Sequence, residues 1–398
     1  MACLICMMLS YAMIKRQIEK ELVSAAENMP VVSLTGPRQS GKTTLVKSVF
    51  PHHRYVNLEE PDTREYAITD PRGFLNDIGG KAIIDECQYA KDIFSYIQAD
   101  VDKNPQNGKF ILTGSQNILM SDRISQSLAG RAAILRLLPF SISELEDTPY
   151  QKDSYADYLY KGFYPRIYDQ KLDPARWYAS YINTYLERDV RQILNVGDLH
   201  SFQTFFKLCA GRIGQLINLS AMSNEIGVSY QTVKRWLSVL EASYIIFMLP
   251  PYYRNFNKRV VKSPRLYFYD PGLAVNILGL KSTDQVKTNY MKGELFESLV
   301  LSEIRKNVLI TGSEPSMYFW RDSNGNEIDC IIETGSEPIA IEIKAAMTLN
   351  QHLFKGLMKW KALTNLKQDN LYLVYGGDEN QDRSEVRIRS WKHIPFPG

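Results

Sequence analysis

The stretch VVSLTGPRQSGKTTLVKSVF, residues 31–50, places a glycine-rich loop between an apolar run and a helix-forming run. Residues 36–43 fit the pattern G-x-x-x-x-G-K-[ST], and a strand before the loop with a helix after it is the context in which this pattern binds phosphate. Gly36 and Gly41 permit backbone angles that a Cβ forbids, so successive N–H groups can turn toward phosphate oxygens at a helix N-terminus. The sequence therefore predicts an α/β domain that binds a nucleotide.

The loop residues have separate expected roles. Lys42 is expected to reach the β- and γ-phosphates, and the hydroxyl of Thr43 to ligate Mg²⁺. The alternative is an ordinary glycine-rich turn, and the next motif argues against it. The residues predicted to contact nucleotide are Gly36, Pro37, Arg38, Gln39, Ser40, Gly41, Lys42, Thr43 and Thr44, together with Asp85 of the next motif.

A second motif, KAIIDECQ at residues 81–88, is an apolar run that ends in two carboxylates. We expect a buried parallel strand whose Asp85 emerges at the carboxyl edge of the sheet, where the metal of a bound nucleotide lies. Asp85 would hold Mg²⁺ through water, and Glu86 would polarise the attacking water.

Two further segments predict residues that act on the γ-phosphate. KFILTGSQN, residues 109–117, predicts a strand with Ser115 at its polar end, where a side chain can sense the γ-phosphate or lie in a plain turn. In residues 121–145, Arg131 follows a polar helix and precedes an apolar strand. It is placed to act as an arginine finger on the nucleotide of a neighbouring subunit, or it is a surface arginine at a helix end.

The run of GPRQSGKTT, IIDE, LTGS and SLAGRA, in this order, resembles the AAA+ superfamily. In particular it is similar to bacterial and archaeal ATPases that carry a C-terminal domain of unknown function, DUF4143. The resemblance covers nearly the whole chain after Met13 and implies binding and hydrolysis of ATP with Mg²⁺. ATP is favoured over GTP because no N-K-x-D guanine-reading motif follows the loop.

The composition sets limits on partners and location. Hydrophobic residues make up 44% and charged residues 23% of the chain, as in an ordinary globular protein, and the net charge is only +3. Contact with DNA would therefore need a local basic patch. Five scattered cysteines, at 3, 6, 87, 209 and 330, favour reduced thiols in the cytoplasm over a disulfide framework.

The apolar N-terminus, MACLICMMLSYAM, is too short to span a bilayer and lacks the basic flank of a secretory signal. We expect translation to start at Met13, with residues 1–12 as an extension or, alternatively, as a membrane-surface anchor. No other stretch approaches the about 18 consecutive apolar residues that a spanning helix needs, so no membrane partner is expected.

Residues 199–280 have the pattern of a winged helix: a short helix, a Gly-Val-Ser turn, a second helix and a strand pair. Seven basic residues and one acidic residue, Glu241, lie between Ser229 and Arg265, an excess that suits duplex phosphates. Binding to a protein partner is the alternative. The basic residues are Lys234, Arg235, Arg254, Lys258, Arg259, Lys262 and Arg265, and we expect Gln231, Lys234 and Arg235 to face the groove.

The C-terminal third contains a second set of polar residues. Glu297 lies on a predicted amphipathic helix, Asp329 follows a hairpin, and Glu342 and Lys344 share one face of a strand. The order resembles the PD-(D/E)xK nuclease fold, with Ile328 in place of its proline. Asp329 and Glu342, with Glu297 as a third or merely exposed carboxylate, would hold a divalent cation, and Lys344 would orient or activate water.

We thus predict a P-loop AAA+ core with a parallel sheet, a winged-helix middle and an α/β restriction-endonuclease-like end. Two functions remain open at this point. One is an ATP-driven machine or switch that acts on DNA, with the nuclease-like domain as effector or clamp; whether it forms homo-oligomers is left open. The other is a signalling ATPase whose later domains bind proteins and cleave nothing. The predicted segments are 13–150 (ATPase), 151–198 (helical connector), 199–280 (winged helix) and 285–398 (nuclease-like).

Overall fold

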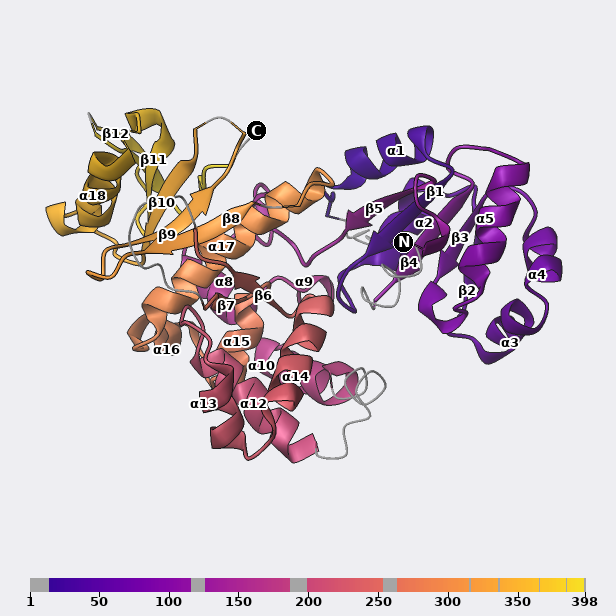
Figure 1. Cartoon of the computed structure of the whole chain (residues 1–398), viewed down its shortest axis with the longest axis horizontal. Coiled ribbons are helices and arrows are strands. Elements are labelled where there is room, and N and C mark those ends of the chain that lie inside the picture. The colour runs from indigo at the N-terminus through magenta and orange to yellow at the C-terminus, as the bar shows by residue number, and fades with distance from the viewer. Residues whose placement is uncertain are drawn as a thin grey trace, which may run out of the picture.

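The computed structural model describes residues 14–115, 126–186, 199–252 and 263–396, apart from 315, 336, 365 and 384. Three groups of elements follow one another along the chain. Figure 1 shows the first group on the right, the last on the left, and the middle group below and between them. Expectations for residues 1–13, for 116–117 and for the basic residues 254, 258, 259 and 262 lie outside the described residues.

Five short strands form a wholly parallel sheet in the first group. Their order is β2-β3-β4-β1-β5, and every neighbouring pair runs parallel. β1, β3 and β4 are buried at every position, as expected for central strands covered on both faces. The strands are β1 (Val31–Thr35), β2 (Arg54–Asn57), β3 (Ala82–Asp85), β4 (Phe110–Gly114) and β5 (Ala132–Arg136).

Helices cover both faces of this sheet. On one face Leu22 and Leu45 pack with Leu34 of β1. On the other face Phe94 and Ile97 pack with the buried residues of β3 and β4. The helices of this group are α1 (Glu19–Asn28), α2 (Lys42–Val49), α3 (Pro61–Thr69), α4 (Pro71–Ile78), the 3₁₀ turn η1 (Cys87–Tyr89) and α5 (Ile93–Lys103).

The middle group is mainly helical and has an aromatic core. Tyr158, Tyr164, Trp177 and Tyr178 are buried, so the aromatic residues of the predicted connector are core residues and not a stacking platform. Its elements are α7 (Ile142–Leu145), α8 (Tyr155–Lys161), α9 (Pro165–Asp169), α10 (Pro174–Tyr181), η2 (Ile182–Leu186), α12 (Leu199–Gly211), α13 (Leu219–Ile226), α14 (Tyr230–Ala242), β6 (Ile246–Leu249), β7 (Arg265–Phe268), α15 (Pro271–Ile277) and α16 (Thr283–Thr288).

The predicted helix-turn-helix is present in this group. Gly227 ends α13 in the left-handed conformation, and the Ser229 hydroxyl accepts from the Thr232 amide to begin α14. β6 and β7 then pair antiparallel. The order of elements is the one expected for a winged helix, and assignment to that fold remains a prediction.

The last group contains a six-stranded mixed sheet in the order β12-β13-β11-β10-β9-β8. β11 runs parallel to β10 and β13, and the other pairs are antiparallel. Its elements are β8 (Met317–Arg321), β9 (Glu327–Ile332), β10 (Ile339–Lys344), η3 (Gln351–Phe354), α18 (Lys355–Thr364), η4 (Gln368–Asn370), β11 (Leu371–Tyr375), β12 (Gln381–Asp382) and β13 (Arg387–Ser390).

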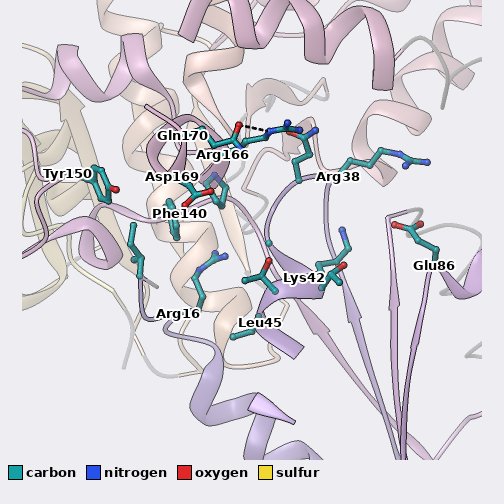
Figure 2. A pocket seen from close by; sticks show the side chains of 16 residues that line it. Arg16, Arg38, Lys42, Leu45, Glu86, Phe140, Tyr150, Arg166, Asp169 and Gln170 are labelled. Atoms are coloured by element: carbon teal, nitrogen blue, oxygen red, sulfur yellow. Dashed lines mark hydrogen bonds between the residues drawn. The ribbon is translucent and has the colours of Figure 1, made fainter. Parts of the chain in front are cut away.

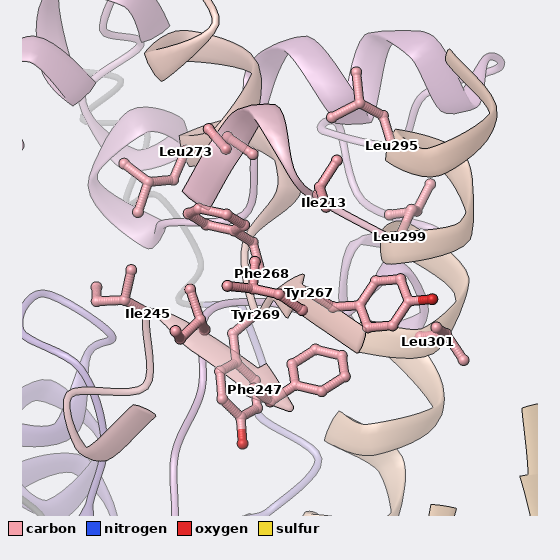
Figure 3. Packing of buried hydrophobic residues seen from close by; sticks show 14 of the residues in the cluster. Ile213, Ile245, Phe247, Tyr267, Phe268, Tyr269, Leu273, Leu295, Leu299 and Leu301 are labelled. Atoms are coloured by element: carbon pink, nitrogen blue, oxygen red, sulfur yellow. The ribbon is translucent and has the colours of Figure 1, made fainter. Parts of the chain in front are cut away.

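Helix α17 (Lys292–Ile310) joins the three groups, as Figure 1 shows. The helix was expected to be amphipathic, but buried residues occupy most of its circumference. Its Leu295, Leu299 and Leu301 belong to one buried cluster with Tyr267 of β7, and Figure 3 shows Leu299 and Leu301 near the tyrosine ring. Near its other end, Lys306 donates to the carbonyl of Phe140, which directly follows the first sheet.

No helix among the described residues is long and apolar enough to cross a membrane.

Candidate functional site: the phosphate-binding loop and its pocket

The glycine-rich loop connects the carboxyl end of β1 to the start of α2. Gly41 precedes the helix with φ 94°, a left-handed conformation that side chains disfavour. A Cβ on Gly36 would lie 2.0 Å from the carbonyl oxygen of Leu137, so only glycine allows this close approach. Both glycines are therefore required by the backbone path, as the sequence pattern predicted.

Polar groups inside the loop are arranged for an anion. Lys42 is buried, and its Nζ donates to the carbonyl oxygens of Gly36 and Pro37, each at 2.9 Å. The hydroxyl of Ser40 is buried with no hydrogen-bond partner and can donate to an anion. An unsatisfied polar atom is costly, and this one lies at the predicted phosphate site. The loop thus fits the triphosphate that its sequence implies.

Asp85 lies at the carboxyl end of β3, where the sequence placed it. Its carboxylate accepts from the hydroxyl of Thr43 at 2.8 Å, from the hydroxyl of Tyr55 at 2.8 Å and from the hydroxyl of Thr113. The pair of Thr43 and Asp85 therefore presents two oxygen ligands side by side. Hard divalent cations such as Mg²⁺ prefer oxygen ligands of this kind, so the residues fit the expected metal.

Glu86 follows Asp85 in a left-handed conformation, with φ 57°. A non-glycine residue in this region is uncommon and is enriched at functional sites. Its Oε2 accepts from the Ser115 hydroxyl at 3.3 Å and from the side-chain amide of Gln88. The structure thus brings together Glu86 and Ser115, two of the residues predicted to act near the γ-phosphate.

A cavity of about 470 Å³ opens beside the loop. Figure 2 shows Lys42 and Glu86 toward one side of it, and Phe140, Tyr150, Arg166 and Asp169 toward the other. Residues from four segments line it: the chain before α1, the loop with α2, Glu86, and the stretch from 140 to 170 that contains α9. The lining residues are Ile14, Arg16, Arg38, Gln39, Gly41, Lys42, Thr43, Thr44, Leu45, Glu86, Phe140, Tyr150, Pro165, Arg166, Asp169 and Gln170.

Arg16 is a site residue that sequence reasoning missed. Its guanidinium donates to the Ser40 carbonyl of the loop at 2.9 Å, to the Leu138 carbonyl at 2.6 Å and to the Glu144 carboxylate at 3.0 Å. It also lies 4.8 Å from the ring centroid of Phe140. These contacts fix the loop to the wall of the pocket.

Arg131 lies away from the pocket of its own chain. It directly precedes β5, at the edge of the sheet opposite the phosphate-binding loop, since β5 runs parallel to β1. Its Nη2 donates to Asp102 at 3.0 Å, and its Nε donates to the other oxygen of the same carboxylate. Arg131 is therefore not part of the pocket of its own chain.

The C-terminal residues predicted from the sequence also meet in space. Lys344 Nζ lies 3.0 Å from Asp329 and 2.7 Å from Glu342. Arg265 of β7 lies 3.5 Å from Glu297, 2.5 Å from Glu327 and 3.9 Å from Asp329. We call Glu297, Glu327, Asp329 and Glu342 the carboxylate cluster. Arg265 was counted in the basic excess that suits duplex phosphates, but its side chain is buried and contacts this cluster.

The metal site predicted at Asp329 and Glu342 stays a prediction. Within the described part of the chain, no group of three or more His, Cys, Asp and Glu residues is placed to hold a metal ion. Burial, followed by the charge of Asp329, raises the pKa of Glu297 and of Glu342 to about 8. Glu297 is not the exposed carboxylate of the alternative interpretation, since its side chain is only 14% exposed.

Comparison with known proteins divides the chain into three. Family models match an AAA domain over residues 28–146, a domain of unknown function (DUF8612) over 152–284, and a domain of unknown function (DUF4143) over 292–396. This chain is an AAA-domain protein with a C-terminal DUF4143 domain. The resemblance drawn from the sequence motifs is thereby confirmed. One model spans both the predicted connector and the predicted winged helix.

Relatives match over most of their length. A protein of Mycobacterium tuberculosis, described as uncharacterized, is 28% identical over 378 residues, which is 94% of this chain and 82% of the relative. An uncharacterized protein of Haemophilus influenzae is 21% identical over 389 residues, which is 89% of this chain and 92% of the relative. Among solved structures, a Walker-type ATPase of Pyrococcus abyssi is 16% identical with a TM-score of 0.44, covering 66% of this chain and 95% of that chain.

We predict that Arg16→Met weakens ATP binding by this AAA domain about tenfold, because a charged donor to the loop carbonyl is worth about 1.5 kcal/mol. Arg54→Met is the matched control. Arg54 also pairs with a carboxylate and a carbonyl, but it is exposed and lies on the edge strand β2. Titration with a fluorescent ATP analogue measures both affinities. Equal affinities in the two variants would contradict the role given to Arg16.

Proposed function

We propose that this protein binds ATP with Mg²⁺ in the pocket beside residues 36–43 and hydrolyses it. The observation that carries the proposal is the contact of Thr43 with Asp85 at 2.8 Å, directly next to Glu86. A hydroxyl at the start of a helix and a carboxylate at the end of a strand form the metal side of a phosphoryl-transfer site, and the following glutamate faces the same cavity.

The proposed roles follow from the chemistry of each side chain. Lys42 leaves its two carbonyl partners and donates to phosphate oxygens, and the loop amides bind the same anion. Thr43 and Asp85 hold Mg²⁺, which when bound neutralises charge on the phosphates. Glu86 accepts a hydrogen bond from the attacking water and takes its proton. Ser115 orients Glu86 through their hydrogen bond.

The remaining walls of the pocket support a nucleoside triphosphate. Ile14, Phe140 and Pro165 give an apolar end that suits a purine ring, while Arg38 and Arg166 add positive charge for the phosphates. In Figure 2 Arg166 reaches from α9 and is joined to Gln170, the contact of 3.3 Å between Nε and Oε1. The pocket thus draws on both the AAA domain and the start of the DUF8612 domain.

We predict that Lys42→Ala abolishes tight ATP binding, whereas Glu86→Gln keeps binding and lowers turnover about a hundredfold or more. The two variants differ because one residue holds phosphate and the other activates water. Binding is measured by equilibrium titration and turnover by phosphate release. Glu65→Gln, an exposed carboxylate on α3, serves as the control. Hydrolysis by Glu86→Gln at the parent rate would remove Glu86 from the mechanism.

We further propose that Arg131 acts on the nucleotide of a neighbouring copy, so that hydrolysis requires a homo-oligomer. Its exposed position on the sheet edge opposite the loop supports action between subunits. Arg131→Ala is expected to lose turnover and to regain part of it when mixed with Lys42→Ala, since mixed interfaces pair intact residues. Asp102→Asn, which removes only the ion pair within the subunit, is expected to stay active. Full activity of Arg131→Ala alone would disprove the proposal.

DNA is a second candidate partner, supported by the exposed face of α14. Gln231, Lys234 and Arg235 are exposed, while the helix buries Val233 and Trp236 against the middle group.

We expect Lys234→Ala with Arg235→Ala to weaken binding to duplex DNA. The slope of log affinity against log salt should become shallower by about 0.9 for each phosphate that the variant no longer neutralises. Lys287→Ala, at an exposed lysine on α16, is the control. Absence of salt-dependent binding in anisotropy titrations would favour the alternative, a protein partner.

A further inference from the structure

We infer that the carboxylate cluster is a charge-compensated contact between the middle group and the C-terminal sheet, in which Arg265 takes the place of the divalent cation. The inference goes beyond the proposed ATPase, because it concerns residues that the ATP pocket does not use. Arg265 belongs to β7, Glu297 to α17, and Asp329 to β9. The contact therefore connects three elements that are far apart in the sequence.

Hydrogen bonds from within the protein already reach Asp329 and Glu297 of the cluster. Asp329 Oδ2 accepts from Lys344 Nζ at 3.0 Å and from the backbone amide of Ile343 at 2.8 Å. Glu297 Oε1 accepts from the hydroxyl of Tyr267 and from Arg265. Metal ligation would have to replace these donors, each of which is fixed by a strand.

Two positive charges, those of Arg265 and Lys344, already lie against the carboxylates. The guanidinium of Arg265 cannot lose its proton, and its side chain is only 7% exposed, so it cannot turn away into solvent without leaving buried carboxylates unpaired. It also lies 4.7 Å from the ring centroid of Phe319 on β8, which packs one face of the guanidinium. A divalent ion beside Arg265 and Lys344 would meet two like charges in a poorly solvated site.

Backbone segments also close over the cluster. A Cβ on Gly356 of α18 would lie 3.0 Å from Glu342 Oε2, and one on Gly214 would lie 3.8 Å from Glu297 Oε2. Glu342 Oε2 is itself buried with no hydrogen-bond partner. Gly356 therefore packs closely against Glu342, on the side of its unpartnered oxygen.

The test is a Mn²⁺ titration of the full-length protein without nucleotide, by calorimetry. The inference expects that Asp329→Asn leaves the Mn²⁺ isotherm unchanged. Asp85→Asn accounts for any ion held at the ATP pocket. A site with one Mn²⁺ per chain that survives Asp85→Asn and is lost in Asp329→Asn would overturn the inference.

The second measurement is thermal unfolding. Arg265→Met is expected to lower the unfolding midpoint by about 5 °C, and Arg387→Met, at the more exposed pair with Asp369 on the same sheet, by much less. Adding Glu297→Gln to Arg265→Met is expected to recover part of the loss, because it removes a carboxylate left unpaired. If Arg265→Met does not fold, the Mn²⁺ titration and the unfolding midpoint of the double variant still test the inference. Strictly additive effects of the two changes would contradict charge compensation.

Discussion

The buried pair of Lys306 and Glu303 determines how the parts of this molecule fit together. Both side chains are only 2% exposed, and their charged atoms lie 2.8 Å apart. Burying two charges is costly unless every donor and acceptor is satisfied. The remaining bonds come from the first part of the chain, since Lys306 donates to the Phe140 carbonyl and Glu303 accepts from the Ile142 amide. Helix α17 and the segment after β5 must therefore keep one relative position.

This constraint extends to the phosphate-binding loop. Ile142 begins α7, whose Glu144 accepts from Arg16, and Arg16 in turn donates to the Ser40 carbonyl. A chain of charged and hydrogen-bonded contacts thus connects the helix at the start of the DUF4143 domain with the ATP pocket. The ring of Phe140 lies in the wall of that pocket, while its carbonyl binds Lys306. Phe140 therefore contacts both the pocket, through its ring, and helix α17, through its carbonyl.

The parts predicted well from the sequence are those whose signal is local. The phosphate-binding loop, the strand that ends at Asp85 and the helix-turn-helix each depend on residues within about twenty positions of one another. Parallel pairing of β3 with β4 then brings Ser115 to Glu86 without further information, because carboxyl ends of parallel strands share an edge. Arg16 was missed and Arg265 was misplaced because the residues that they contact are distant in the sequence. Glu144 lies 128 positions from Arg16, and Glu297 lies 32 positions from Arg265. No spacing rule distinguishes a buried arginine of this kind from one that faces DNA.

Helix α17 begins at a boundary between family models, but its buried charges depend on residues that lie before that boundary. The three family models divide the chain neatly, and the third begins at residue 292, the first residue of α17. Yet the charges that this helix buries are satisfied by residues 140–142, which lie at the end of the first model and just before the second. A DUF4143 domain exchanged between two such proteins by recombination would bring Glu303 and Lys306 but not their partners. Shuffling at the sequence boundary would therefore succeed only between chains that share the backbone path around Phe140.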